Sequence, residues 1–148
     1  MRYRNQILFR FTIGSANNNV LKFWEPNAPS YEERLESLYH THREGFKTSI
    51  SCEPMLDNRI DEVVTMVAPY VTDSIWLGKL NLGMVRCKIN GYNDSETINR
   101  VKQVEEWQSD ENILMLYEQF KDHPKIKWKE SIKKVIGLDL NEEKGMDL

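Results

Sequence analysis

Cysteine is scarce in this sequence, and the two residues present, Cys52 and Cys87, lie far apart in a chain of 148 residues. Neither a CxxC pair nor the spacing of a zinc ribbon occurs, which argues against a disulfide framework and a cysteine-based metal centre. Histidine is also scarce, and the two that lie close together, His40 and His42, would point to different sides of a helix. The sequence therefore predicts no self-contained metal site.

Long apolar runs are absent as well. No run approaches the roughly 18 residues of a membrane-spanning helix, and Arg10 interrupts the apolar stretch near the N-terminus. That stretch also lacks the long apolar region and the small-residue cleavage site of a signal peptide. The net charge of -3 gives no overall attraction to nucleic acid or to a membrane surface. We expect a cytoplasmic protein that makes no contact with a membrane.

The length and the ordinary apolar fraction of 40% favour one folded domain with a real core. Apolar strand patterns at 7–13, 46–52 and 74–80 alternate with two helix patterns. Ser30 and Glu33 form a capping box for the first helix, which Gly45 closes. Pro69 ends the second helix. Alternation of this kind predicts an α/β fold in which parallel strands are joined by helical crossovers.

The second half of the sequence has a different pattern. Residues 81–93 are predicted to form a loop with, at most, a short strand. Helix patterns follow, one after Asn93, one after Ser109 and one from Trp128 to Val135 that Gly137 closes. We therefore expect an α/β part at 1–92, a helical C-terminal segment at 93–138 packed on it, and an acidic flexible tail at 139–148.

Polar side chains follow each predicted strand. Ser15 comes after the first strand, Ser51 and Glu53 come at the end of the second, and Lys79 and Asn81 come at the end of the third. Because parallel strands end at one edge of a sheet, these groups would jointly hold a polar ligand such as a ribose or an amino-acid head group. Two alternatives stay open: the groups are solvated loop residues, or Glu53 and Lys79 form a structural ion pair.

For the cysteines, Arg34 and the lysine-rich segment 121–134, a structural role is the main interpretation. Cys52 ends an apolar strand and is predicted to be a buried hydrophobe, whereas Cys87, beside two basic residues, is a weak candidate for a reactive thiol. Arg34 is predicted to be solvated. The segment 121–134 holds six lysines and Trp128, which makes it the best candidate for a nucleic-acid contact, although a solvated helix face is the favoured interpretation.

Four stretches of the chain together resemble a known family. These are FTIGS, WEPNAPSYEERLESL, GFKTSISCEPML and VTDSIWLGKLN, within residues 6–81, with weaker similarity in KIKWKESIKKVIGL. They resemble the later half of the radical S-adenosylmethionine (radical SAM) core, in the branch related to spore photoproduct lyase. The resemblance implies an incomplete (β/α) barrel of about three strand–helix units at 1–92, with cofactors at the carboxyl ends of the strands.

The resemblance also implies roles for individual residues. Ser15 would contact the ribose or methionine part of S-adenosylmethionine, Ser51 and Glu53 would line the cofactor cleft, and Lys79 would lie near the adenine or the substrate. The catalytic residues stay unknown. The family's CxxxCxxC motif, which holds a [4Fe-4S] cluster, is absent from this sequence, so the cluster is expected only in a complete protein.

The sequence thus predicts the C-terminal part of a radical SAM enzyme that is inactive alone. The strand at 6–13 would expose an unpaired edge, which predicts pairing with an N-terminal half-barrel or with a second copy. The alternative is a non-catalytic α/β module that binds a partner protein or nucleic acid.

Overall fold

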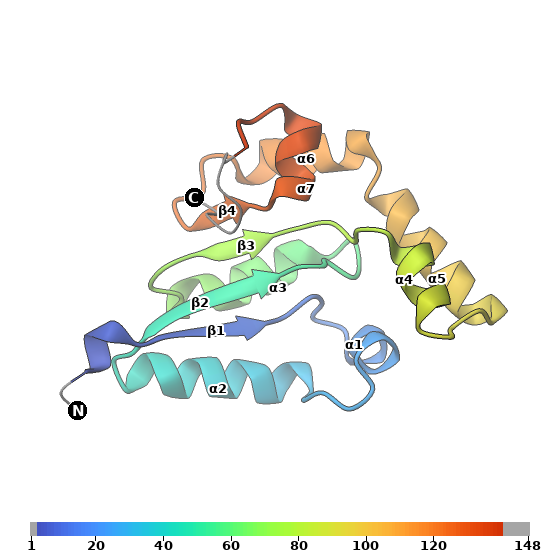
Figure 1. Cartoon of the computed structure of the whole chain (residues 1–148). Coiled ribbons are helices and arrows are strands. Elements are labelled where there is room, and N and C mark those ends of the chain that lie inside the picture. Colours follow the sequence, from blue (N-terminus) through green and yellow to red (C-terminus); the bar gives the residue numbers. More distant parts are fainter. Residues whose placement is uncertain (1–2, 141–148) are drawn as a thin grey trace.

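The fold is taken from a computed structural model, which describes residues 3–140. The chain forms a parallel α/β arrangement (Figure 1). In order, the elements are the 3-10 helix η1 (Arg4–Gln6), β1 (Leu8–Thr12), α1 (Asn18–Trp24), α2 (Tyr31–Arg43), β2 (Lys47–Cys52), α3 (Ile60–Val67), the 3-10 helix η2 (Ala68–Tyr70), β3 (Ile75–Leu77), α4 (Gly83–Ile89), α5 (Ser95–Trp107), α6 (Asp110–Phe120), β4 (Ile126–Trp128) and α7 (Glu130–Ile136).

The strands form one sheet in the order β1-β2-β3-β4, and every neighbouring pair is parallel. The predicted α/β class with parallel strands is confirmed. Within residues 3–140 the sheet does not close into a barrel, and β1 has a strand neighbour on one side only. The predicted unpaired edge at the first strand is therefore present, and Phe9 on this strand is 40% exposed.

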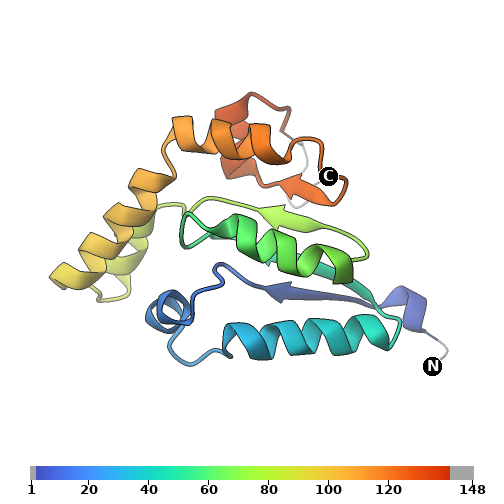
Figure 2. The ribbon, with the colours of Figure 1, turned by 180° about the vertical axis from the view of Figure 1, so that it is seen from behind.

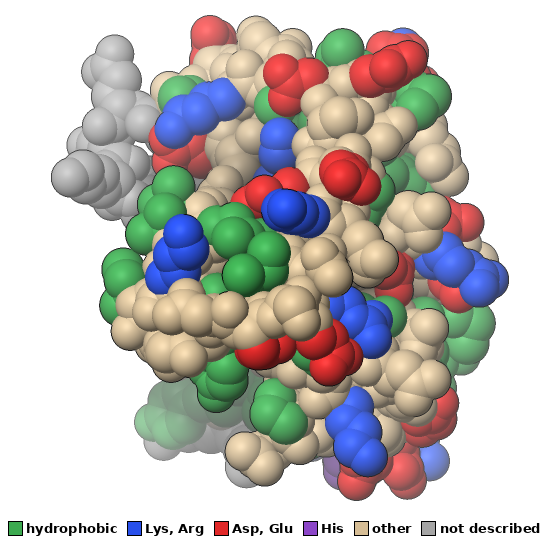
Figure 3. All heavy atoms as spheres, turned by 90° about the vertical axis from the view of Figure 1, so that its right-hand side faces the viewer, with side chains coloured by type: hydrophobic (Ala, Val, Ile, Leu, Met, Phe, Trp, Pro, Cys, Tyr) green, Lys and Arg blue, Asp and Glu red, His purple; other side chains and the backbone are tan. Residues whose placement is uncertain are grey.

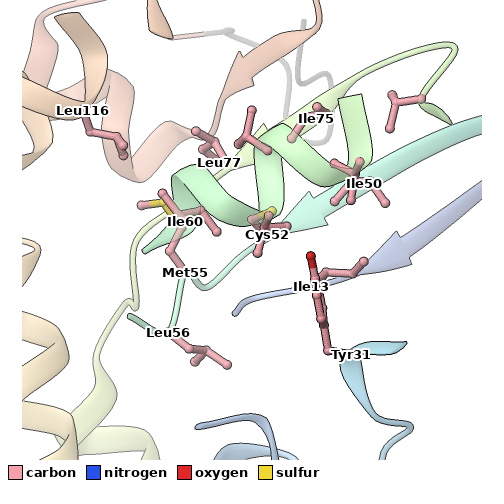
Figure 4. Close-up of a cluster of buried hydrophobic side chains, with 14 of the residues drawn as sticks. Ile13, Tyr31, Ile50, Cys52, Met55, Leu56, Ile60, Ile75, Leu77 and Leu116 are labelled. Carbon is pink, nitrogen blue, oxygen red and sulfur yellow. The ribbon is translucent and has the colours of Figure 1, made fainter. Parts of the chain in front are cut away.

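The core lies on one face of the sheet. Ile50 of β2 and the β3 residues Ile75 and Leu77 are fully buried in one cluster with side chains of α2, α3, α6 and α7, part of which Figure 4 shows. Seen from behind, α3 lies in front of the sheet, whereas the strands lie in front of α3 in the first view (Figures 1 and 2). Because side chains alternate along a strand, the residues between these core positions point to the opposite face.

Local signals set the helix ends as predicted. The Ser30 hydroxyl accepts a hydrogen bond from the Glu33 amide, and the Glu33 carboxylate accepts one from the Ser30 amide, so the capping box is complete. Gly45 has a φ of 77°, a left-handed conformation that glycine adopts without a Cβ clash. Asp94 and Ser109 cap α5 and α6 through their side chains.

A buried glutamine joins the sheet to the second half of the chain. The Gln108 side chain accepts a hydrogen bond from the Leu80 amide at 2.7 Å and donates one to the Met55 carbonyl at 2.8 Å. It is 2% exposed, so these two bonds satisfy polar groups that water does not reach. The second half is thereby fixed to the loops that follow β2 and β3.

The structure overturns two predictions for the second half. Residues 83–89 form helix α4, so the predicted loop with a short strand is wrong. The segment 93–138 is not purely helical, because Ile126–Trp128 forms β4 beside β3 and the last helix starts only at Glu130. A three-residue strand carries too little pattern to be told from a helix, and its partner is far away in sequence. Of the predicted acidic tail, residues 141–148 lie outside the described part of the chain.

Candidate functional site

The carboxyl ends of the four strands meet at one edge of the sheet, as their parallel pairing requires. In Figure 1 the arrowheads of β1, β2 and β3 point to this edge, and α1, α4 and α5 lie on the same side of the molecule. On the surface of this side, basic and acidic side chains lie interspersed beside a group of hydrophobic side chains (Figure 3). The polar residues predicted from the sequence are distributed over three different surroundings at or near this edge.

Glu53 and Lys79 line the same pocket. Its volume is about 560 Å³, and it lies where β2, β3 and β4 end. The other lining residues come from the loop after β3 and from the start of α7: Asn81, Leu82, Lys129, Glu130, Ser131 and Lys134. We call this space the carboxyl-edge pocket. It combines ammonium, carboxylate, amide and hydroxyl groups, a donor and acceptor set that suits a polar ligand of mixed charge.

The ion pairs in the carboxyl-edge pocket differ from the one considered in the sequence. Glu53 pairs with Lys129 at 3.4 Å, and Lys79 pairs with Asp110 at 3.6 Å, so the alternative of a Glu53–Lys79 pair is wrong. The Lys79 amide also donates a hydrogen bond to the Ser131 hydroxyl. Sequence reasoning missed Lys129 because the residue follows β4, which lies in the segment predicted to be helical.

The backbone brings Glu53 close to β3. The Glu53–Pro54 peptide bond is cis, and the Met55 amide donates a hydrogen bond to the Gly78 carbonyl at 2.9 Å. A Cβ built at Gly78 would lie 2.9 Å from Glu53 Cγ and 3.1 Å from Lys129 Cβ. Only glycine therefore leaves room for both members of the Glu53–Lys129 pair at this point of the edge.

Ser15 lies apart from the carboxyl-edge pocket. It is fully buried, its hydroxyl donates a hydrogen bond to Asp57, and the same hydroxyl accepts one from the Asn17 amide. Asp57 in turn accepts a hydrogen bond from the Arg59 amide. These bonds hold the loop after β1 against the loop after β2, and the predicted contact of Ser15 with a cofactor stays a prediction.

Ser51 belongs to the sheet face opposite the core. It is aligned with Thr12 of β1 and Trp76 of β3. Among the described residues no helix of the core layer lies on this face, and we call it the open face. Trp76 is 3% exposed because basic side chains lie over its ring: Arg10 Cζ, Lys127 Nζ and Lys129 Nζ are 5.9, 5.3 and 4.9 Å from its centroid. The sequence signal for this cluster is a basic residue between apolar residues, Arg10 in β1 and Lys127 in β4.

The two cysteines have different surroundings. Cys52 is fully buried in the core, as predicted, and burial raises the pKa of its thiol to about 12. The thiol therefore stays protonated at neutral pH, which excludes it as a nucleophile there. Cys87 is half-buried and lines a cavity of about 320 Å³ between α1, α4 and α5, together with Phe23, Trp24, Pro26, Leu80, Gly83, Arg86, Asn90, Tyr92 and Thr97. Sequence reasoning missed this mainly apolar cavity because α4 was predicted to be a loop.

The basic segment 121–134 does not form one continuous cationic surface. Lys121 pairs with Glu118, Lys134 pairs with Glu130, and Trp128 is buried beside Tyr117. These contacts favour the interpretation of mostly solvated and paired lysines. Lys127 in β4 and Lys129 just after it contribute cations to the open face.

Within residues 3–140, no group of three or more His, Cys, Asp or Glu side chains is arranged to hold a metal ion. None of the helices in that range is both long enough and apolar enough to cross a bilayer. Comparison with known proteins identifies no relative: no family model matches the chain, and no curated protein or solved structure matches it significantly.

Proposed function

We propose that the chain is the C-terminal part of a radical SAM enzyme and that its sheet supplies one portion of the barrel wall. The observation that supports this proposal best is the one-sided sheet. Parallel sheets usually have both faces covered. Within residues 3–140, this sheet packs helices on one face and carries polar side chains on the other, and its outer strand β1 has one free edge. The wall of a (β/α) barrel likewise has helices outside, further strands at its edges and functional polar groups at the carboxyl ends of its strands.

In this proposal the carboxyl-edge pocket receives the polar head of S-adenosylmethionine. The Glu53 carboxylate would accept hydrogen bonds from a ligand ammonium or hydroxyl, and Lys79 would donate a charge-assisted hydrogen bond to the adenine. Glu53 already pairs with Lys129, and Lys79 already pairs with Asp110. A bound ligand with both charges would replace these ion pairs by contacts with its own charged and polar groups. Ser51, on the open face one strand residue before Cys52, would face the interior of the barrel.

The iron–sulfur cluster does not fit this chain. A [4Fe-4S] cluster needs three or four thiolates, and the sequence has two cysteines, of which Cys52 is fully buried in the core. The complete enzyme would obtain the cluster from another part of the barrel. With one electron from the reduced cluster, S-adenosylmethionine would supply a radical that abstracts a hydrogen atom from the substrate, and we expect no such reaction from these 148 residues alone.

Calorimetric titration with S-adenosylmethionine tests the proposal. We expect saturable binding that weakens about tenfold or more in Glu53→Gln and in Lys79→Gln, since each substitution removes one charge-assisted contact. Glu36→Gln and Lys102→Gln change the same charges at exposed helix positions and should leave binding intact. Absence of binding to the folded chain, or equal weakening in the control variants, would contradict the proposed cofactor site.

The DNA upstream of the Met1 codon provides a second test. An in-frame or neighbouring reading frame with CxxxCxxC would supply the missing cluster ligands, and co-expression of the two products should then give a complex with the absorption of an iron–sulfur protein. A long upstream region without such a motif would count against the proposal.

The alternative is a non-catalytic module that binds a partner protein through β1. Exposed Leu8 and Phe9, on a strand with one neighbour, favour this version over a nucleic-acid module. Light scattering over a range of concentrations measures self-association through this edge. If the module binds nucleic acid instead, its affinity should fall steeply as the salt concentration rises. Substitution of Lys127, Lys129 and Lys133 should also lower that affinity.

A further inference from the structure

The open face has an unusual composition for the surface of an acidic protein. Side-chain alternation and the strand register place eight strand residues on it: Leu8, Arg10, Thr12, Lys47, Ser49, Ser51, Trp76 and Lys127. Basic, hydroxyl and apolar side chains are present among these strand residues, and carboxylates are not. The whole chain carries a net charge of -3, whereas the charged strand residues of this face, Arg10, Lys47 and Lys127, are all basic.

Three cationic groups converge on Trp76. The Arg10 guanidinium comes from β1, Lys127 from β4 and Lys129 from the residue after β4, and all three lie within 6 Å of the Trp76 ring centroid. Glu53 pairs with Lys129. Within the described residues, Arg10 and Lys127 form no ion pair. Like charges gathered over one ring repel each other, and an anion bound among them relieves that repulsion.

Trp76 itself has an unused donor. Its indole Nε1 is buried and has no hydrogen-bond partner among the described residues, although the ring is 3% exposed. A buried N–H group without an acceptor is unfavourable. The donor belongs to the ring over which the three cations lie, so an oxygen-rich anion bound beside this ring can accept from the N–H group and pair with the cations. Repulsion among the cations and the unused indole donor therefore indicate the same kind of ligand.

We propose that the open face around Trp76 binds a small phosphate-bearing molecule. A phosphate group accepts several hydrogen bonds at once, and it fits a guanidinium from β1, an indole N–H from β3 and an ammonium from β4. The compactness of the cluster favours one phosphate group over an extended polyanion. This site goes beyond the proposed function: it shares Lys129 with the carboxyl-edge pocket, but Arg10, Trp76 and Lys127 do not line that pocket.

Nuclear magnetic resonance of the chain with ¹⁵N-labelled tryptophan tests this site directly. Trp76→Phe identifies the Trp76 indole signal. Inorganic phosphate, ribose 5-phosphate and a single-stranded oligothymidylate are then titrated separately at constant ionic strength set with sodium chloride. We expect saturable movement of the Trp76 signal with both small phosphates, and affinity lower by about tenfold or more in the Arg10→Gln/Lys127→Gln variant.

The double variant Arg43→Gln/Lys102→Gln is the matched control. It removes one arginine and one lysine that are exposed on α2 and α5, away from the open face, and should bind the small phosphates as the unaltered chain does. Circular dichroism verifies that both variants are folded. Conservative Arg10→Lys keeps the charge and loses the fork geometry, so it should retain part of the affinity.

Three outcomes would overturn the proposal. The first is a Trp76 signal that does not saturate with either small phosphate, or that sodium chloride shifts to the same extent. The second is an equal loss of phosphate affinity in the Arg43→Gln/Lys102→Gln control. The third is binding of oligothymidylate without binding of either small phosphate, which would assign the face to nucleic acid. Because these titrations contain no S-adenosylmethionine, their failure and the failure of the proposed cofactor site are separate results.

Discussion

Arg34 is the residue whose substitution best tests how the carboxyl edge of the sheet is held. The sequence predicts a solvated side chain, but the structure buries it, with 8% exposed, and this prediction is wrong. Its Nε donates to the Pro29 carbonyl at 2.9 Å, Nη1 donates to the Thr12 carbonyl at 2.8 Å, and Nη2 pairs with Glu25. One guanidinium thus joins α2 to the end of β1 and to the loop before α2.

Arg34→Ala should lower the free energy of unfolding by about 3–4 kcal/mol. Hydrogen bonds that involve a charged group contribute about 1.5–3 kcal/mol each, and loss of one partner of a buried ion pair costs about 3–5 kcal/mol. The three contacts share one guanidinium and Glu25 is partly exposed, so the effects do not add, and the expected loss lies near the lower end of this range.

Urea unfolding followed by tryptophan fluorescence measures this change. Arg43→Ala, on the same helix with an exposed side chain, should change the free energy of unfolding by less than about 0.5 kcal/mol. Arg34→Lys should recover only part of the loss, because an ammonium lacks the fork of donors. A loss below about 1 kcal/mol in Arg34→Ala would refute the reasoning.

Three further predictions concern the core and the candidate site. Gln108→Ala should lower the free energy of unfolding by about 2–4 kcal/mol in urea, since it leaves two buried backbone groups without partners, whereas exposed Gln119→Ala should have little effect. Burial raises the pKa of Tyr31 to about 12. Its contribution to stability is therefore complete below about pH 10, the pKa of an unfolded tyrosine, and is lost as the pH rises to 12. Tyr31→Phe should flatten that alkaline decline in thermal unfolding, and an unchanged decline would contradict this origin. Gly78→Ala should displace Glu53 and weaken binding of S-adenosylmethionine in calorimetry, while a variant that binds normally would show that the close approach has no functional role.

Local sequence signals predicted much of the first half of the fold. The capping box at Ser30 and Glu33, the left-handed Gly45 and the apolar spacing of α3 each act within a few residues, and each is present in the structure. The buried state of Cys52 was likewise predictable from its place at the end of an apolar strand. Interactions over short stretches of chain can be read without knowing the tertiary fold.

The candidate site was predictable only in part. The rule that parallel strands end at one edge correctly placed Glu53 and Lys79 in a common pocket. It did not separate Ser15, whose hydroxyl is used by Asp57, from the groups that line the pocket. Which polar side chain faces a ligand and which one joins two loops depends on the packing of those loops, and spacing along the chain does not contain that information.

The sequence by itself determined the α/β class, the parallel direction of the strands and the ends of several helices, because caps, glycines and apolar periodicity act locally. Only the tertiary structure decided that β4 completes the sheet, that Lys129 pairs with Glu53 and that Arg10 and Lys127 meet over Trp76. The physical reason is the length of β4. Three residues have no periodicity of their own, and their strand state comes from hydrogen bonds to β3, which lies about 50 residues earlier in the chain.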